Sequence, residues 1–311
     1  MSSFSLEKGS IMTYSIVARD PKTGEFGVAV QSHYFSVGSV VTWARAGVGA
    51  VATQSMVEVS YGPLGLDLMA GGKSAEEALN ALVMADSNSD VRQVAMIDSK
   101  GRVAVHTGRK CIPYAGHVIG DQFTCEANLM SNDRIWGAME RSYKKNSNLS
   151  FPERLIATLE AAEEEGGDIR GKQSAAILVV SPELYPNYWQ GRVIELRVED
   201  HTEPLSELKR LLRLKRGYEW GDKGDVFLSA GKFKESQEAF QKAANYAPEI
   251  EELRYWEGIS LLESGRVSEA ASILRTIFKK DPRWIQVTRS LKEIGMINSD
   301  EAVLSTLYAN L

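Results

Sequence analysis

The sequence predicts an α+β domain built as a four-layer αββα sandwich, followed by an all-α helical-repeat domain. The first observation is an uneven composition. Residues 1–204 hold 19 of the 26 glycines and a net charge of −6, whereas residues 205–311 hold 7 glycines and a net charge of +1. The second is that predicted helices come in pairs between blocks of strands in residues 12–204, which favours antiparallel sheets covered by helices. The third is a repeat of 34 residues in the second part.

Length and composition limit the class of protein. The 311 residues suffice for about two domains, and 43% hydrophobic with 25% charged residues is typical of a globular chain. No apolar run approaches the roughly 20 residues of a membrane helix, and Met1–Ile11 lacks the apolar core of a secretory signal. Two cysteines make no disulfide framework, and the net charge is −5. We therefore expect a cytoplasmic protein without nucleic-acid or membrane partners.

Local signals then define the elements of the first domain, residues 12–204. The turn sequence Asp20–Gly24 reverses the chain between two β-branched runs. Ser74 followed by Glu77 makes a capping box at a helix start. In order, the predicted elements are strands at 13–18, 27–31, 39–44 and 48–53, helices at 62–70 and 75–85, strands at 94–98 and 102–107, an extended run at 117–129, helices at 133–144 and 152–164, and strands at 175–180 and 193–198.

The second domain, residues 205–311, matches itself at an offset of 34 residues. The offset aligns Gly224 with Gly258, Gly231 with Gly265, Phe240 with Leu274 and Pro248 with Pro282. A helix–turn–helix unit of this length resembles the tetratricopeptide repeat. Because repeats bury their apolar faces only by stacking, we expect one or two capping helices in Trp284–Leu311, broken near Gly295, and a leading helix at 205–214. Such arrays usually present a concave surface to a protein segment, which predicts a protein partner; extension of the core or dimerisation is the alternative.

Several separated segments resemble a known family. They include Met12-Thr-Tyr-Ser-Ile-Val-Ala-Arg-Asp-Pro, Gly167-Asp-Ile-Arg-Gly-Lys-Gln and the runs at 27–30, 46–54 and 60–66. In this order they resemble the bacterial and archaeal family named domain of unknown function 1028. That family is grouped by fold with the N-terminal-nucleophile hydrolases, so the resemblance implies the αββα arrangement of proteasome β-subunits and penicillin acylases.

The resemblance also implies a nucleophile. In N-terminal-nucleophile enzymes a Thr, Ser or Cys is the first residue of the mature chain, and its α-amine is the general base. Such an amine has a pKa of about 7.7–8.0 and is partly neutral at working pH. By position the candidate is Thr13, at the head of the first strand, and the alternative is a threonine without a chemical role. Ser15 points to the same face, either as a supporting hydroxyl or as a packing residue.

Twelve residues precede Thr13, and while they remain attached its nitrogen is an amide that cannot act as a base. Three explanations fit. In the first, translation starts at Met12 and that methionine is removed. In the second, the segment is removed by self-cleavage, and in the third, the domain has no such activity. Of the two explanations that make the domain an enzyme, we favour the first. Residues 1–11 are therefore treated as a leader of open status.

Polar residues at other strand ends are expected to converge on a cleft near Thr13. Gln31 and His33 lie in the segment that follows the second strand, and Gln54 follows the fourth. We expect these three residues to contact substrate, although His33 alone equally suits a surface role. Asn128 is expected to donate to an oxyanion, with a strand-edge asparagine as the alternative.

The glycine-rich loop Gly166–Ser174 brings an acid and a base together. Asp168 and Arg170, two residues apart, either clamp a carboxylate in the catalytic site or form an ion pair that tethers the loop. Gln173 is expected to contact substrate beside them. The four histidines and two cysteines lack ligand spacing, so no metal or cofactor is expected.

Two functions of different classes follow. The first is a hydrolase of amide-type bonds, acting on an unidentified small molecule or peptide, with Thr13 as nucleophile. The second is a non-catalytic binding or scaffold protein that keeps the same fold and recruits partners through its helical repeats. Exposed sheet edges in a domain of this kind favour a homodimer.

Overall fold

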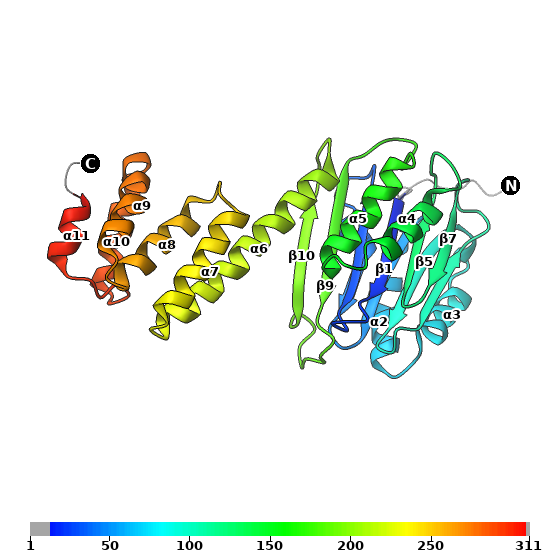
Figure 1. Cartoon of the computed structure of the whole chain (residues 1–311). Coiled ribbons are helices and arrows are strands. Elements are labelled where there is room, and N and C mark those ends of the chain that lie inside the picture. Colours follow the sequence, from blue (N-terminus) through cyan, green and yellow to red (C-terminus); the bar gives the residue numbers. More distant parts are fainter. Residues whose placement is uncertain (1–12, 309–311) are drawn as a thin grey trace. The chain divides into compact units, whose positions relative to one another are not determined.

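The structure is a computed structural model that describes residues 13–308. The predicted leader, residues 1–11, lies outside the described residues. The chain divides into two compact units, with the division between Lys209 and Arg210. The first unit contains both sheets and the second is helical throughout its described part (Figure 1).

Two antiparallel sheets form the centre of the first unit. The strand order is β10-β9-β2-β1-β8-β7 in the six-stranded sheet and β3-β4-β5-β6 in the four-stranded sheet. The strands are β1 (Thr13–Arg19), β2 (Phe26–Ser32), β3 (Thr42–Arg45), β4 (Gly49–Ser55), β5 (Arg92–Asp98), β6 (Val103–Thr107), β7 (Gly116–Gly120), β8 (Phe123–Ala127), β9 (Ser174–Val180) and β10 (Arg192–Val198).

Helices cover the outer face of each sheet. On the four-stranded sheet lie α2 (Tyr61–Ala70) and α3 (Ala75–Ala85), and on the six-stranded sheet lie α4 (Ile135–Lys145) and α5 (Phe151–Glu164). Figure 1 shows these four layers, so the predicted αββα arrangement is confirmed. The predicted capping box is also confirmed, because the Glu77 backbone N–H donates to Ser74 Oγ at 3.1 Å and the Ser74 N–H donates to Glu77 Oε2 at 2.8 Å.

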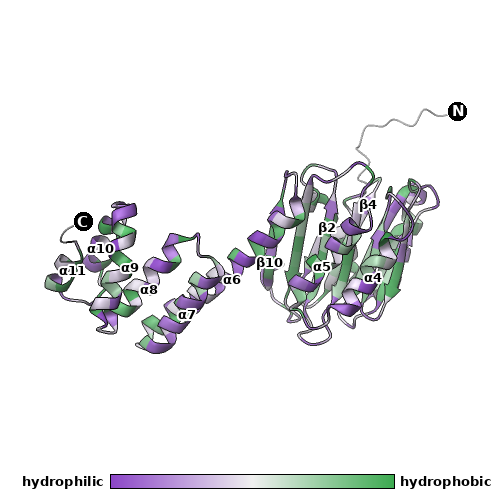
Figure 2. Cartoon of the chain, turned by 45° about the horizontal axis from the view of Figure 1, so that its top comes forward, coloured by the Kyte–Doolittle hydropathy of each residue, from purple (hydrophilic) through white to green (hydrophobic). Residues whose placement is uncertain are grey.

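Strand alternation separates the two faces of each sheet. Val28 and Val30 of β2 pack against Ala50 and Ala52 of β4 in the core between the sheets. Gly27, next to Val28, points to the other face, towards α5, where a Cβ would lie 2.6 Å from Leu155 Cδ1. Figure 2 shows that hydrophobic residues are concentrated on the strands, whereas the helices carry both kinds of residue. The odd-numbered residues of β1 therefore point towards the four-stranded sheet.

One predicted strand is wrong in its first half. Instead of a strand over residues 39–44, the chain forms the short helix α1 (Gly38–Val41), and β3 begins only at Thr42. The β-branched residues favour a strand locally, but one helical turn buries both Val37 and Val41 between the sheets. The extended run predicted at 117–129 is the hairpin of β7 and β8.

The second unit contains a run of helices at the predicted spacing. They are α6 (Pro204–Ser229), which begins in the first unit, α7 (Phe233–Tyr246), α8 (Glu251–Glu263), α9 (Val267–Lys280), α10 (Arg283–Glu293) and α11 (Glu301–Tyr308). The bounds of α7 and α9 lie 34 residues apart. Gly231 and Gly265 follow the ends of α6 and α8 with φ of +70° and +80°, where glycine is favoured. The leading helix predicted at 205–214 is the first part of the longer α6.

Replacing Gly258 with alanine is expected to loosen the packing of α8 on α9. A Cβ at Gly258 would lie 2.7 Å from Leu274 Cδ2, so we expect a loss of about 1–3 kcal/mol in opening free energy. Hydrogen exchange of the α8 and α9 amides in the full chain measures it. The control is Gly137→Ala on α4, where the Cβ would have an Arg141 nitrogen at 3.4 Å and helix propensity predicts a gain of about 1 kcal/mol. Equal effects of the two substitutions would contradict this assignment of the contact.

Candidate functional site

Thr13 begins β1 and lies between the two sheets. Its side chain is 0% exposed, and Thr13 Oγ1 donates to Ser32 Oγ, its neighbour across β2, at 3.2 Å. On the other side the Thr13 backbone N–H donates to the Asn128 carbonyl at 3.3 Å, and the Asn128 N–H donates to the Thr13 carbonyl at 3.0 Å. The strands on both sides of β1 therefore fix the position of this hydroxyl.

A buried polar network extends from Thr13 towards the four-stranded sheet. Gln54 Nε2, at the end of β4, donates to the Thr13 carbonyl at 3.4 Å and to Gln93 Oε1 at 2.9 Å. Ser15 Oγ lies 2.8 Å from Gln54 Oε1 and 3.1 Å from Glu126 Oε1. All of these side chains are fully buried. Such a polar interior is stable only when nearly every group has a partner.

Gln93 of β5 connects the largest number of groups in this network. Its Nε2 lies within 3.0–3.1 Å of Thr107 Oγ1, the Gly116 carbonyl and the Ala127 carbonyl, so two N–H groups serve three acceptors. Its Oε1 accepts from Gln54 and also from Asn128 Nδ2, the latter at 3.0 Å. One side chain thus ties together the two sheets.

Glu126 of β8 is the ionisable member of the network. Burial raises the pKa of this carboxyl to about 8, because a charge is poorly solvated between the sheets. Its Oε2 has no hydrogen-bond partner among the described residues. Ser15 Oγ donates to Glu126 Oε1 at 3.1 Å, which lowers this pKa and offsets part of the effect of burial. Burial therefore favours the uncharged carboxyl near neutral pH.

The structure brings together four of the predicted site residues: Thr13, Ser15, Gln54 and Asn128. Gln31 is not among them. It pairs with Tyr14 across β1 and β2, and alternation places it on the face towards α5, whose Glu163 accepts from Tyr14. This placement corrects the expectation that all strand-end residues line one cleft.

The other predicted residues lie in the loop before β9 and its surroundings. Arg170 and Asp168 form an ion pair at 2.8 Å, and Asp168 Oδ2 also accepts from the His33 backbone N–H at 3.1 Å. The exposed His33 ring lies 3.3 Å from the Lys172 carbonyl. The Gln173 N–H donates to the Ser32 carbonyl at 3.1 Å, while its side chain donates to Asp200. The loop is therefore attached to the end of β2 beside Thr13.

Sequence reasoning missed Ser32, Gln93 and Glu126. Ser32 stands directly opposite Thr13 in the first hairpin, so the register of that hairpin was an available signal. The sequence also held a signal for Glu126, since it is the sole acidic residue of β8. Gln93 depends on which strands face each other across the sheets. Within residues 13–308, His, Cys, Asp and Glu side chains form no group of three or more that could hold a metal ion.

Fold and site together define a mixed α/β domain with antiparallel sheets and a buried polar centre, followed by a helical repeat region. The model of the family described as "Family of unknown function (DUF1028)" matches residues 13–208, and the chain belongs to that family. A tetratricopeptide repeat model matches residues 227–294. Both resemblances drawn from the sequence are thereby confirmed.

A solved structure is similar to a large part of this chain. It is the crystal structure of protein SPO2555 from Silicibacter pomeroyi, also matched to DUF1028, with 31% sequence identity and a TM-score of 0.58. The similarity covers 65% of this chain and 85% of that chain. No curated protein matches the chain. None of the described helices combines the length and apolar character needed to cross a bilayer.

Proposed function

We propose that this chain is a hydrolase of amide-type bonds in which Thr13 Oγ1 attacks the carbonyl carbon. The observation that supports the proposal is the placement of Thr13, at the head of a central strand and inside a buried polar network between the sheets. A threonine that only ends a strand needs no such surroundings. Hydroxyl nucleophiles, in contrast, require fixed partners that orient them.

The proposed chemistry needs the Thr13 nitrogen to become a free amine. That amine takes the hydroxyl proton, Oγ1 forms an ester with the substrate acyl group, and the leaving amine takes the proton. Water then attacks the ester with the same amine as base, which restores the hydroxyl and releases the acid. Ser32 Oγ, 3.2 Å from Thr13 Oγ1, orients the nucleophile.

Other residues have proposed roles around this centre. Asn128 Nδ2, 3.5 Å from the Thr13 carbonyl, is the proposed oxyanion donor. Asp168 and Arg170 are proposed to hold the loop that borders the site, with His33 and Gln173 contacting substrate there. Thr13 is 0% exposed, so the proposed reaction also requires a path by which substrate reaches Oγ1.

The repeat region supports a second proposed role. Tetratricopeptide-type repeats suggest protein–protein interaction in general, so we propose that the second unit binds a protein segment. The hydrolase proposal concerns the first unit and does not depend on that partner.

A chain that begins at Thr13 is expected to hydrolyse amide substrates that the chain of 311 residues does not. Only the shorter chain has the α-amine base, and positioned proton transfer contributes roughly 10²–10⁴ in rate. The measurement is release of amine from an amide library by both chains, with intact mass establishing the first residue of each. Thr13→Ser is expected to retain activity, whereas Thr13→Ala should show only background release. Equal release by the Thr13→Ala chain would overturn the proposal.

A further inference from the structure

A cavity lies on the first unit, at the edges of the two sheets. It has a volume of about 400 Å³ and is bordered by β3 on one side and by β9 and β10 on the other. The six-stranded sheet is wider than the four-stranded one, and β3 packs against β9. The face of β10 that continues the inter-sheet core is therefore left without a covering strand.

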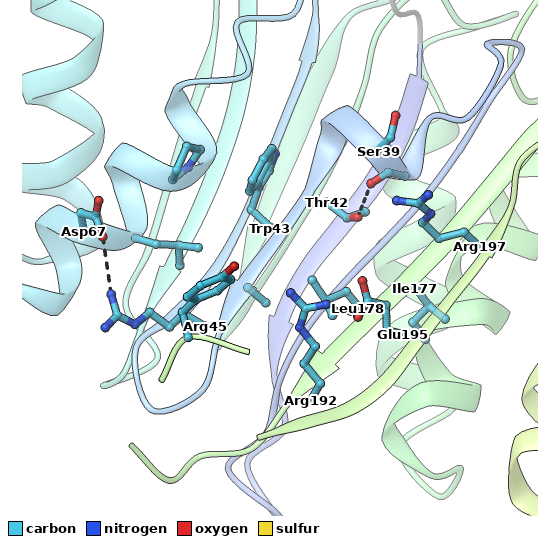
Figure 3. A pocket seen from close by; sticks show the side chains of 15 residues that line it. Ser39, Thr42, Trp43, Arg45, Asp67, Ile177, Leu178, Arg192, Glu195 and Arg197 are labelled. Carbon is cyan, nitrogen blue, oxygen red and sulfur yellow. Dashed lines mark hydrogen bonds and ion pairs between the residues drawn. The ribbon is translucent and has the colours of Figure 1, made fainter. Parts of the chain in front are cut away.

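Three arginines from two strands border this cavity. Arg45 comes from β3, and Arg192 and Arg197 come from β10. Figure 3 shows Arg192 and Arg197 on β10, Trp43 on the side of β3, and Arg45 extended towards Asp67. Arginine presents a planar fork of N–H donors that matches a carboxylate, so the two arginines of β10 are suited to an organic anion.

Each arginine is held by a carboxylate that leaves it accessible. Arg45 pairs with Asp67 at 3.5 Å, Arg192 pairs with Glu195, and Arg197 pairs with Glu199 at 2.7 Å. The three arginine side chains are 30–42% exposed. Exposed pairs of this kind contribute little stability, so a ligand carboxylate can replace a protein carboxylate at low cost.

The remaining lining of the cavity is mixed: Ser39, Thr42, Asp67 and Glu195 are polar, and the other side chains are apolar or aromatic. Trp43 and Tyr188 supply rings, while Pro63, Leu66 and Leu178 supply aliphatic surface. The Trp43 Nε1–H is already used by the Val40 carbonyl at 3.0 Å, so this indole offers the cavity its apolar surface. When a flat hydrophobic group binds there, its surface and the apolar surface of these side chains are both removed from contact with water.

We propose that this cavity binds a small organic carboxylate with a flat apolar body, with the carboxylate on the arginines of β10 and the body against Trp43. None of the lining residues belongs to the Thr13 network. The site therefore goes beyond the proposed hydrolase function, and binding is measurable whether or not the chain hydrolyses amides.

The test titrates the full chain with indole-3-acetate, followed by ligand-observed NMR. Tryptamine keeps the ring and replaces the carboxylate by an ammonium group, and acetate keeps the carboxylate without the ring. We expect saturable binding of indole-3-acetate at least tenfold tighter than that of either control compound, weakening at high salt. Equal binding of indole-3-acetate and tryptamine, or no saturation by any compound, would overturn the proposal.

Variants locate the binding and separate it from a structural role. Arg192→Gln is expected to weaken the binding of indole-3-acetate at least tenfold. Glu195→Gln removes the protein carboxylate that competes for Arg192 and should tighten binding several-fold. Arg134→Gln removes an ion pair with Glu165 outside the cavity, so it should leave the binding of indole-3-acetate unchanged. Weakening by Glu195→Gln as large as that by Arg192→Gln would show that only the ion pair matters, against the proposal.

Discussion

Replacing Gln93 with leucine is expected to destabilise the first unit by about 3–5 kcal/mol. Leucine has a similar size but cannot donate or accept. The substitution leaves the Gly116 and Ala127 carbonyls, Thr107 and the amides of Gln54 and Asn128 without their shared partner. Each buried polar group that loses its partner costs about 1–3 kcal/mol, and relaxation of the neighbours recovers part of that sum.

Hydrogen exchange of the β5 and β8 amides in the full chain measures this loss. The matched control is Gln241→Leu on the exposed side of α7, where the same chemical change should alter stability by less than about 0.5 kcal/mol. A Gln93→Leu chain within about 1 kcal/mol of the unsubstituted one would contradict the network, since each lost partner alone should cost that much.

Replacing Glu126 with glutamine is expected to remove a loss of stability at alkaline pH. The pKa of Glu126 rises from the ordinary 4.5 to about 8 in the folded chain. A raised pKa means that the unfolded chain releases this proton first. The contribution of neutral Glu126 to the free energy of unfolding is fully present below pH 4.5 and is lost as the pH rises through 8. Between pH 6 and 9 this group should cost on the order of 2–3 kcal/mol.

Glutamine stays neutral over this range and keeps an oxygen that can accept from Ser15 Oγ. Urea unfolding at pH 6 and pH 9 compares the two chains. Between these pH values the free energy of unfolding of the Glu126→Gln chain should fall by about 2–3 kcal/mol less than that of the unsubstituted chain. Glu77→Gln is the control, because hydrogen bonds to Ser74 lower the pKa of exposed Glu77, so it is ionised throughout. The same pH dependence in the Glu126→Gln and unsubstituted chains would show that Glu126 is not buried as an acid.

Much of the fold could be predicted because its signals lie close together in the chain. The spacing between Gly231 and Gly265 marks the repeats, and Ser74 with Glu77 starts α3. Residues 39–44 show the limit of such reasoning. Their β-branched side chains favour a strand, but burial between two sheets, which no local pattern encodes, selects a helical turn at Gly38–Val41.

The candidate site was predictable only along single strands. Thr13 and Ser15 share a face by alternation, which is a local property. Gln31 was assigned by its place at a strand end, yet Ser32 is the residue whose side chain reaches Thr13. Gln93 enters the network from the opposite sheet, and only the packing of the two sheets brings it there.

The last strand of the six-stranded sheet has a consequence for the behaviour of the protein in concentrated solution. An outer strand such as β10 offers a template on which another chain can add a strand and aggregate. Arg192, Glu195 and Arg197 on this strand would each have to lose water for that addition to occur, which is costly for charged groups. Charged side chains on an outer strand discourage edge-to-edge association, so these three residues can act against aggregation while contributing little to folding.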